Sequence, residues 1–214
     1  RDSFGVSCEV VKNFGEAYSR EANYEAILAE CEIQTEFTED ELSEAAARAK
    51  EPISYEGRVD RRGDVILTID GEGAKDLDDA VSIQKTENGY RLGVHIADVS
   101  HYVREKTALD RCAMARGTSV YFTDKVVPML PKALSNGACS LNSGEDKYAL
   151  SAIIDLDRSG EIIGLSIEES VIRTAVRGVY SEINKIFDGA ADGALLEKHE
   201  CVMPSLTLMR ELYY

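Results

Sequence analysis

Hydrophobic residues recur with helical spacing in the first quarter of the chain. The positions that repeat at i, i+3, i+4 and i+7, as in an amphipathic helix, are Tyr24, Ile27, Leu28 and Cys31. A second helix is expected to begin at Thr38, where Glu41 completes a capping box, and to end at Pro52. Residues 6–11 predict a short strand. Because both helices have acidic polar faces, the pattern favours an exposed linker pair over an acidic binding surface.

From Gly57 onward the pattern changes to short β-branched runs that are typical of strands. Strands are expected at residues 65–69, 80–83, 90–96, 119–122, 148–155 and 161–172. Glu87-Asn88-Gly89 predicts a hairpin turn between the second and third of these strands. A helix is expected over residues 107–116 with Gly117 as its stop, and the prolines of residues 128–131 predict an extended loop.

The helical pattern at the C-terminus has no stop signal. Its apolar face is formed by Val202, Leu206, Met209 and Tyr213. The pattern stops at Tyr214 without a Gly, Pro or polar cap, and the chain begins without Met or an apolar signal core. We therefore expect a piece of a longer protein, truncated at the C-terminus. No run of 18 apolar residues occurs, so no transmembrane helix and no membrane partner are expected.

Composition places the chain among ordinary globular proteins, with 214 residues, 44% hydrophobic and 29% charged. Its net charge of −15 argues against a simple binder of polyanions. The charge is unevenly distributed, because residues 1–56 contain 14 acidic and 5 basic side chains and residues 70–79 contain 5 acidic and 1 basic. The acidity is therefore partly a solvated N-terminal face and partly one concentrated cluster.

Cysteine usage indicates a reducing compartment. The five cysteines are Cys8, Cys31, Cys112, Cys139 and Cys201. Their number is odd and no pair has CxxC spacing, which argues against a zinc site and against a disulfide framework. We expect free, mostly buried thiols in the cytoplasm.

The acidic cluster is the most informative stretch of the sequence. Four aspartates lie between two apolar strands, at Asp70, Asp76, Asp78 and Asp79. Carboxylates packed this closely repel one another, and a bound divalent cation relieves that repulsion. Ligation by carboxylates alone favours Mg²⁺ or Mn²⁺ over zinc. Such a site suits two-metal hydrolysis of phosphate esters. A calcium or structural site and a plain solvated loop stay open, although Lys75 and Val81 break the EF-hand pattern.

These residues carry a resemblance to a known family. The segment TIDGEGAKDLDDAV, residues 68–81, resembles the active-site signature of the ribonuclease II/ribonuclease R family, the RNB domain. Further blocks follow in the family's order, GVHIADVSHYV at 93–103, RGTSVYF at 116–122, VPMLP at 127–131 and LSNGACSLN at 134–142. Residues 15–28 resemble the linker that precedes the domain in the bacterial members.

The resemblance implies an α+β fold in which a mostly antiparallel sheet packs with helices. Residues 57–214 correspond to the N-terminal, incomplete part of the RNB catalytic domain. Residues 1–56 correspond to the tail of a cold-shock-type barrel and a helical linker. The implied activity is Mg²⁺-dependent, processive 3′→5′ hydrolysis of single-stranded RNA to nucleoside 5′-monophosphates. No obligate protein partner is implied.

The resemblance also assigns roles within the site. It implies a catalytic site made of Asp70, Asp76, Asp78 and Asp79. Asp70, Asp76 and Asp79 are expected chiefly to hold Mg²⁺, with Mn²⁺ as an alternative, and Asp78 to serve the chemistry. Tyr121 is expected to stack on the 3′-terminal base. Its sequence context alone would favour a buried strand aromatic.

Other polar residues in these blocks receive weaker assignments. Gly73 departs from the acidic residue usual in the family. The side chains expected to be structural are His95, His101 and Asp98, and those expected to contact the RNA backbone are Asn136 and Ser140. The family's late arginine and glutamate and its basic C-terminal barrel have no counterpart here, so little or no activity is expected from this chain alone.

Two rival interpretations remain. A non-catalytic RNB relative that binds RNA or protein would typically have lost the aspartates, and this chain retains four. A different metal-dependent phosphohydrolase leaves the RGTSVYF and VPMLP blocks unexplained.

Overall fold

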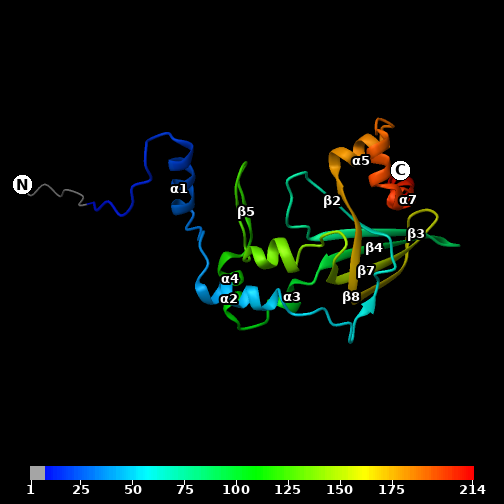
Figure 1. Ribbon diagram of the computed structural model, residues 1–214, viewed down its shortest axis with the longest axis horizontal. Coiled ribbons are helices and arrows are strands. Elements are labelled where there is room, and N and C mark those ends of the chain that lie inside the picture. Colours follow the sequence, from blue (N-terminus) through cyan, green and yellow to red (C-terminus); the bar gives the residue numbers. More distant parts are fainter. Residues whose placement is uncertain (1–7) are drawn as a thin grey trace, which may run out of the picture. The chain divides into compact units, whose positions relative to one another are not determined.

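The computed structural model describes residues 8–214 (Figure 1). These residues form two compact units, one that ends at Glu36 and one that spans Phe37–Tyr214. The smaller unit contains α1, Arg20–Glu30, whose first turn is capped by the Ser19 side chain. The helix predicted from the spacing of the apolar residues between Tyr24 and Cys31 is therefore confirmed. The strand predicted at residues 6–11 is wrong for residues 8–11, which lie in no strand, and residues 6 and 7 lie outside the described part.

The second helix belongs to the larger unit. α2, Glu39–Arg48, begins with the predicted capping box between Thr38 and Glu41. It packs on α4, Ala108–Arg116, and Ala45 is fully buried in that contact region. The small side chains on its inner face allow this close approach, so the helix contributes to the core despite its acidic outer face.

The larger unit is built on a six-stranded sheet. Its strands are β1 (Val59–Asp60), β2 (Ile66–Asp70), β3 (Asp79–Lys85), β4 (Gly89–Ala97), β7 (Asp146–Asp157) and β8 (Ile162–Val179). The pairings β2–β3, β3–β4, β4–β7 and β7–β8 are antiparallel, and β8 runs parallel to β1 and β2. The expected α+β fold with a mostly antiparallel sheet is confirmed.

The long strand β8 closes this sheet on itself. Its first part, up to Arg173, pairs with β7, and its last part, from Thr174 to Val179, pairs with β2. Going from strand to paired strand, the order is β8, β2, β3, β4, β7 and again β8, so these strands form a small closed barrel. Because β2 ends at Asp70 beside Val179, closure fixes the position at which the chain leaves the barrel for the acidic segment.

A chain of polar side chains fills part of the barrel interior. His95 lies between the hydroxyls of Ser82 and Ser151, at 3.0 and 2.7 Å, and Ser151 contacts Ser170 at 2.6 Å. All four residues are buried. A Cβ at Gly93 would lie 2.3 Å from the Ser82 hydroxyl, so glycine is required there. Burial lowers the pKa of His95 to about 4, which keeps the ring neutral.

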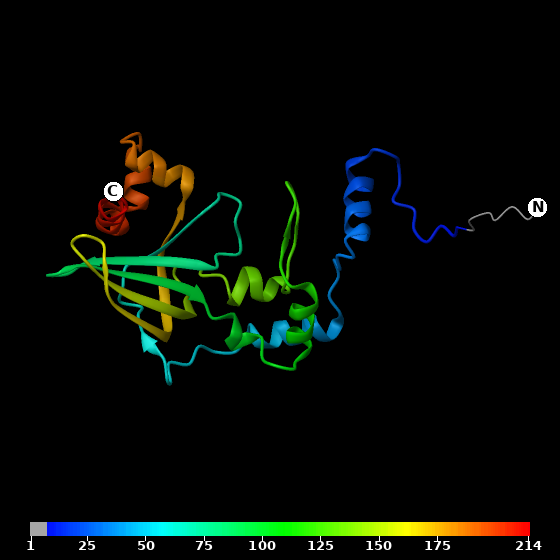
Figure 2. The same ribbon diagram turned by 180° about the vertical axis from the view of Figure 1, so that it is seen from behind.

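Short helices lie against the barrel in two groups, α2 to α4 with the hairpin on one side and α5 to α7 on another (Figures 1 and 2). The helices whose bounds have not yet been given are α3 (Val99–Tyr102), η1 (Leu134–Ala138), α5 (Tyr180–Phe187), α6 (Gly193–Lys198), η2 (Glu200–Val202) and α7 (Met203–Tyr213). The hairpin is formed by β5, Val120–Tyr121, and β6, Val126–Val127. In α7, Leu206 is buried beside Leu67 of β2, whereas Tyr213 is exposed. The predicted helix is confirmed, although its apolar face is covered only in part.

All five cysteines are free. Cys112 and Cys139 are buried, but Cys8, Cys31 and Cys201 are exposed, so the expectation of mostly buried thiols is wrong. Among the described residues, no helix combines the length and apolar character needed to cross a membrane.

Candidate active site

The four aspartates lie on one connection between neighbouring antiparallel strands. Asp70 is the last residue of β2 and Asp79 is the first residue of β3. Asp76 and Asp78 lie in the segment between them. We call residues 70–79 the acidic loop. Antiparallel pairing of β2 with β3 holds the two ends of this loop beside each other, which gathers residues up to nine positions apart.

Burial and, after it, mutual repulsion change the pKa of two carboxyl groups in the acidic loop. Desolvation, followed by the charges of Asp76, Asp79 and Asp70, raises the pKa of Asp78. Desolvation and the charge of Asp79 likewise raise the pKa of Asp70. One carboxylate oxygen of Asp70, Oδ2, is buried and has no hydrogen-bond partner among the described residues. A buried carboxylate oxygen without a donor is costly, and a cation would remove that cost.

The second half of the acidic loop is held by a buried serine. The Ser140 hydroxyl donates to the Lys75 carbonyl at 2.9 Å and accepts from the Leu77 amide at 3.1 Å. These two bonds flank Asp76. The Leu141 amide also donates to the Leu77 carbonyl at 2.9 Å. Ser140 is fully buried, so the expectation that it contacts RNA is wrong. Its hydroxyl is used to order the loop.

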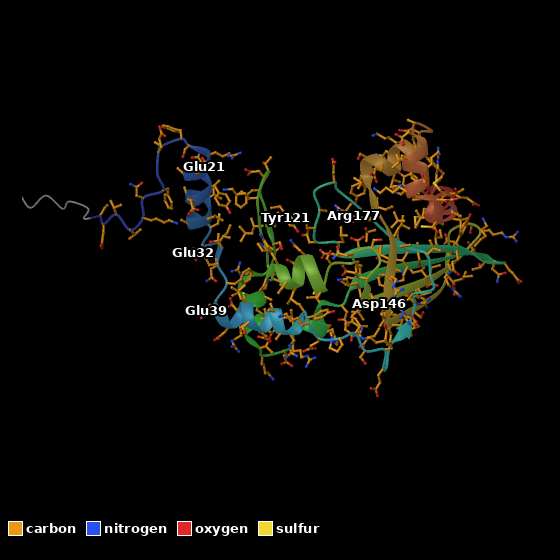
Figure 3. The ribbon with its side chains drawn as sticks, in the orientation of Figure 1. Glu21, Glu32, Glu39, Tyr121, Asp146 and Arg177 are labelled. Carbon is orange, nitrogen blue, oxygen red and sulfur yellow. The ribbon has the colours of Figure 1, made fainter. Side chains whose placement is uncertain are left out.

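The first half of the acidic loop is held by an arginine on β8. Nη2 of Arg177 donates to the carbonyls of Glu72 and Ala74 at 2.9 and 2.8 Å and lies 3.5 Å from that of Gly71. The Thr68 hydroxyl and, after it, the charge of Arg177 lower the pKa of Asp70, which opposes the stronger raising effects. Arg177 and Tyr121 approach the loop from opposite sides (Figure 3).

Tyr121 stands on the β5–β6 hairpin and faces the acidic loop. Its side chain is 62% exposed, so the buried-aromatic alternative is wrong. Its hydroxyl donates to Oδ2 of Asp76 at 2.6 Å. This hydrogen bond raises the pKa of Tyr121 to about 12, so the phenol remains a donor at neutral pH. The bond fixes one end of the ring while its faces stay available to a ligand.

Two hollows meet at Asp76. One, of about 390 Å³, is lined by Asp78, Ile96, Tyr121 and Met129 among others. The other, of about 540 Å³, lies along the hairpin and is also lined by Lys75, Lys132 and Asn136. Asp76, Ser119 and Ser135 line both hollows. The acidic loop therefore borders a cleft lined by both polar and apolar side chains.

The donor set of the acidic loop fits a hard cation in its chemistry. It consists of carboxylates only, and the unpartnered oxygen of Asp70 is an available ligand. Within residues 8–214, however, no three His, Cys, Asp or Glu side chains lie close enough to enclose a metal ion. The carboxylates are thus gathered but do not by themselves form a complete coordination shell.

The remaining predicted residues fall outside the cleft or at its border. Asp98 is buried, caps α3 through the His101 amide and pairs with Arg58 at 2.6 Å, which confirms its structural role. The His101 ring lies near Arg58 and stacks at an angle on Tyr148. A Cβ at Gly73 would meet no atom within 4 Å, so space alone does not explain this departure from the family pattern.

Arg177 and the loop-ordering role of Ser140 were missed by sequence reasoning. Arg177 lies 98 residues or more after the acidic loop, and only the parallel pairing of Thr68 with Arg177 brings it close. No local spacing signals such a contact. For Ser140, its place within the LSNGACSLN block was a signal of importance, but its burial could not be seen from the sequence.

Known proteins are similar to this chain both in sequence and in fold. Residues 58–213 match the RNB domain. Ribonuclease R 1 of Lactococcus lactis is 44% identical over 213 residues, which cover 98% of this chain and 26% of that protein. The structure of Mycoplasma genitalium RNase R in complex with ribose methylated single-stranded RNA superposes with a TM-score of 0.86 at 29% identity, over 93% of this chain and 31% of that one.

A more distant structure shares the fold alone. Yeast Ssd1, a pseudonuclease, matches with a TM-score of 0.63 at 22% identity and covers 75% of this chain and 19% of its own. This chain covers 26%, about a quarter, of the length of the Lactococcus relative. Since the domain match includes the acidic loop, the barrel and the hairpin, the chain belongs to the RNB domain family.

Proposed function

We propose that the acidic loop is the hydrolytic site of a cytoplasmic, Mg²⁺-dependent exoribonuclease. The reaction is the processive 3′→5′ degradation of single-stranded RNA to nucleoside 5′-monophosphates. One observation carries the proposal, namely four aspartates on a single loop of an RNB domain, with a buried oxygen of Asp70 that has no hydrogen-bond partner among the described residues. Relatives named ribonuclease R support the same activity class.

In this proposal Asp70, Asp76 and Asp79 hold Mg²⁺, or Mn²⁺ in its place. The cation supplies activation of the attacking water and stabilisation of the leaving 3′-oxygen. Asp76 is oriented by the Tyr121 hydroxyl and by the two bonds of Ser140 around it. Asp78, whose pKa is raised, borders the smaller hollow, where it would face the scissile phosphate.

Tyr121 is proposed to bind the 3′-terminal base by stacking. Its ring is exposed at the cleft and its hydroxyl is tied to Asp76, so that the base would be placed at a fixed distance from the carboxylates. Stacking suits a sequence-tolerant enzyme because every base offers a π-face.

We further propose that residues 1–214 alone have little or no activity. The net charge of −15 disfavours RNA binding by this chain alone. The chain also spans 26% of the Lactococcus relative.

A non-catalytic RNA- or protein-binding module is the alternative. The fold match to a pseudonuclease favours it, since the fold occurs there without nuclease activity. The retained aspartates at 70, 76, 78 and 79 weigh against it.

The test uses a chimera in which this chain replaces the aligned region of Lactococcus lactis ribonuclease R 1. A 5′-labelled single-stranded RNA is incubated with the chimera or with residues 1–214, with Mg²⁺ or with EDTA. We expect stepwise shortening from the 3′ end only with the chimera and Mg²⁺. Binding of RNA by the chimera without any shortening would support the non-catalytic module.

A further inference from the structure

We propose that Arg177 is a positioning residue that shapes the acidic loop for cation binding. The inference rests on the proposed function, because it concerns the same carboxylates. Arg177 touches none of the aspartate side chains through a hydrogen bond. It acts on the backbone that carries them, through the carbonyls of Glu72 and Ala74.

The strand register delivers this guanidinium to the loop. Parallel pairing places Arg177 opposite Thr68, two residues before Asp70. At the neighbouring pair, a Cβ on Gly178 would lie 2.7 Å from the Thr68 carbonyl, so β8 and β2 approach closely at this point. Arg177 is thus fixed to the barrel at its backbone, and its side chain extends over the strand end to the loop.

Few other hydrogen bonds order the first half of the acidic loop. Within it, the Ala74 amide donates to the Gly71 carbonyl at 3.1 Å. Beyond the strand ladder that ends at Asp70, the described hydrogen bonds from residues 71–74 to the rest of the barrel all come from Arg177. Ser140 orders the other half, around Asp76. The second half is therefore held by several neutral donors, including the Ser140 and Tyr121 hydroxyls and the Ala97 amide, whereas the first half is held by one charged side chain.

The charge of Arg177 allows two possible roles to be distinguished by the change in cation affinity when the side chain is replaced. A guanidinium beside the carboxylates repels a cation, so removing it should strengthen cation binding if charge alone matters. If its main role is to hold the carbonyls of Glu72 and Ala74, removing it should weaken binding, because the loop loses the shape that brings Asp70 toward Asp76. The two roles predict opposite changes.

The experiment compares wild type with R177M, R177K and R173M as the whole chain of residues 1–214. Arg173 lies on the same strand and pairs with Asp146 at 2.6 Å, away from the acidic loop, so R173M removes an equal charge as a matched control. Mn²⁺ affinity is measured from the free-ion signal in electron paramagnetic resonance. Hydrogen exchange of a peptide covering residues 71–78 is measured without metal.

We expect Mn²⁺ binding about tenfold weaker in R177M and an exchange rate about tenfold faster in residues 71–78, as for the loss of two charge-assisted bonds. R173M should match wild type in both measurements. R177K should lie between, since its ammonium keeps the charge and offers three donors on a shorter side chain. R177K also keeps the test decisive if R177M folds poorly.

Equal or tighter Mn²⁺ binding by R177M, or unchanged exchange of residues 71–78, would overturn the positioning role. A wild-type chain that binds no Mn²⁺ would instead count against the metal part of the proposed function. In that case the exchange measurement still decides whether Arg177 orders the loop.

Discussion

The polar cluster around His95 in the barrel and the carboxylates of the acidic loop differ in whether their buried groups have partners. In the interior, the His95 ring and the hydroxyls of Ser82, Ser151 and Ser170 each have a partner, and burial keeps the ring neutral. In the loop, like charges stand together and Oδ2 of Asp70 has no partner among the described residues.

The two groups of residues are expected to have opposite effects on the stability of the fold. A satisfied polar network stabilises one arrangement of the strands, whereas an unsatisfied carboxylate cluster costs stability unless something binds to it. Folded proteins seldom leave buried polar atoms unpaired without a functional reason. The contrast supports the acidic loop as the proposed site and argues against His95 as a catalytic residue.

The largest expected effect separates the two regions by activity. In the chimera, Asp78→Asn should lower RNA hydrolysis by about 10²–10⁴-fold, as for loss of a group that acts in the reaction. RNA affinity should stay within a few-fold, and the free energy of unfolding of residues 1–214 should not fall, because a repelling charge is removed. Single-turnover hydrolysis, filter binding and urea denaturation measure these quantities. A large loss of RNA affinity would remove Asp78 from the chemical role.

A substitution in the interior should have the reverse profile. His95→Leu leaves the Ser82 hydroxyl buried without its partner, so the free energy of unfolding should fall by about 2–3 kcal/mol. Urea denaturation measures this change. Ile167→Ala, on an exposed position of β8, serves as the control and should cost little. If His95→Leu changed Mn²⁺ affinity while stability was kept, the separation of the two regions would be wrong.

Acid should weaken the interior through the same histidine. The pKa of His95 is lowered from 6.5 to about 4 in the folded chain. The unfolded chain therefore binds more protons, and the stability that neutral His95 contributes is present above pH 6.5 and is lost as pH falls toward 4. The loss should reach about 3 kcal/mol at most. Denaturation curves of wild type and His95→Gln should converge over this range, and parallel curves would contradict the account.

The smallest expected effect concerns the aromatic at the edge of the site. In the chimera, Tyr121→Ala should weaken binding of a short RNA by about 1–2 kcal/mol and lengthen the final product. Tyr121→Phe keeps the ring and loses only the bond to Asp76, so it should retain most of the RNA affinity. Product lengths on a denaturing gel and fluorescence anisotropy distinguish the two variants. Unchanged products with Tyr121→Ala would place the base elsewhere.

Local patterns were sufficient for most of the fold. The capping box at Thr38, the stop at Gly117 and the hairpin at Gly89 depend on neighbouring residues, and all three occur as predicted. The strand expected at residues 6–11 failed for the part that is described, because strand propensity does not provide a partner to pair with. The packing of α2 on α4 through Ala45 could not be read from its acidic outer face.

Some residues of the site could also be predicted from their neighbours in the sequence, whereas others depend on contacts between strands that are far apart in the sequence. The spacing of Asp76, Asp78 and Asp79 marks the cluster directly, and the resemblance named Tyr121. The anchors of the loop, Ser140 and Arg177, depend on strand closure across many residues, so no spacing rule indicates them. Their contribution became visible only when β8 was seen to pair with β2.

The central claim is that the acidic loop is a cation site that is destabilising when no cation is bound. Its most direct test is the thermal melting of residues 1–214 with and without millimolar Mg²⁺, beside the double variant Asp70→Asn/Asp79→Asn. Binding to the folded state alone raises the melting temperature. The account predicts that Mg²⁺ raises the melting temperature of wild type by several degrees and leaves that of the double variant nearly unchanged. An equal rise in both proteins would show that Mg²⁺ acts on the general negative charge, and would contradict the claim.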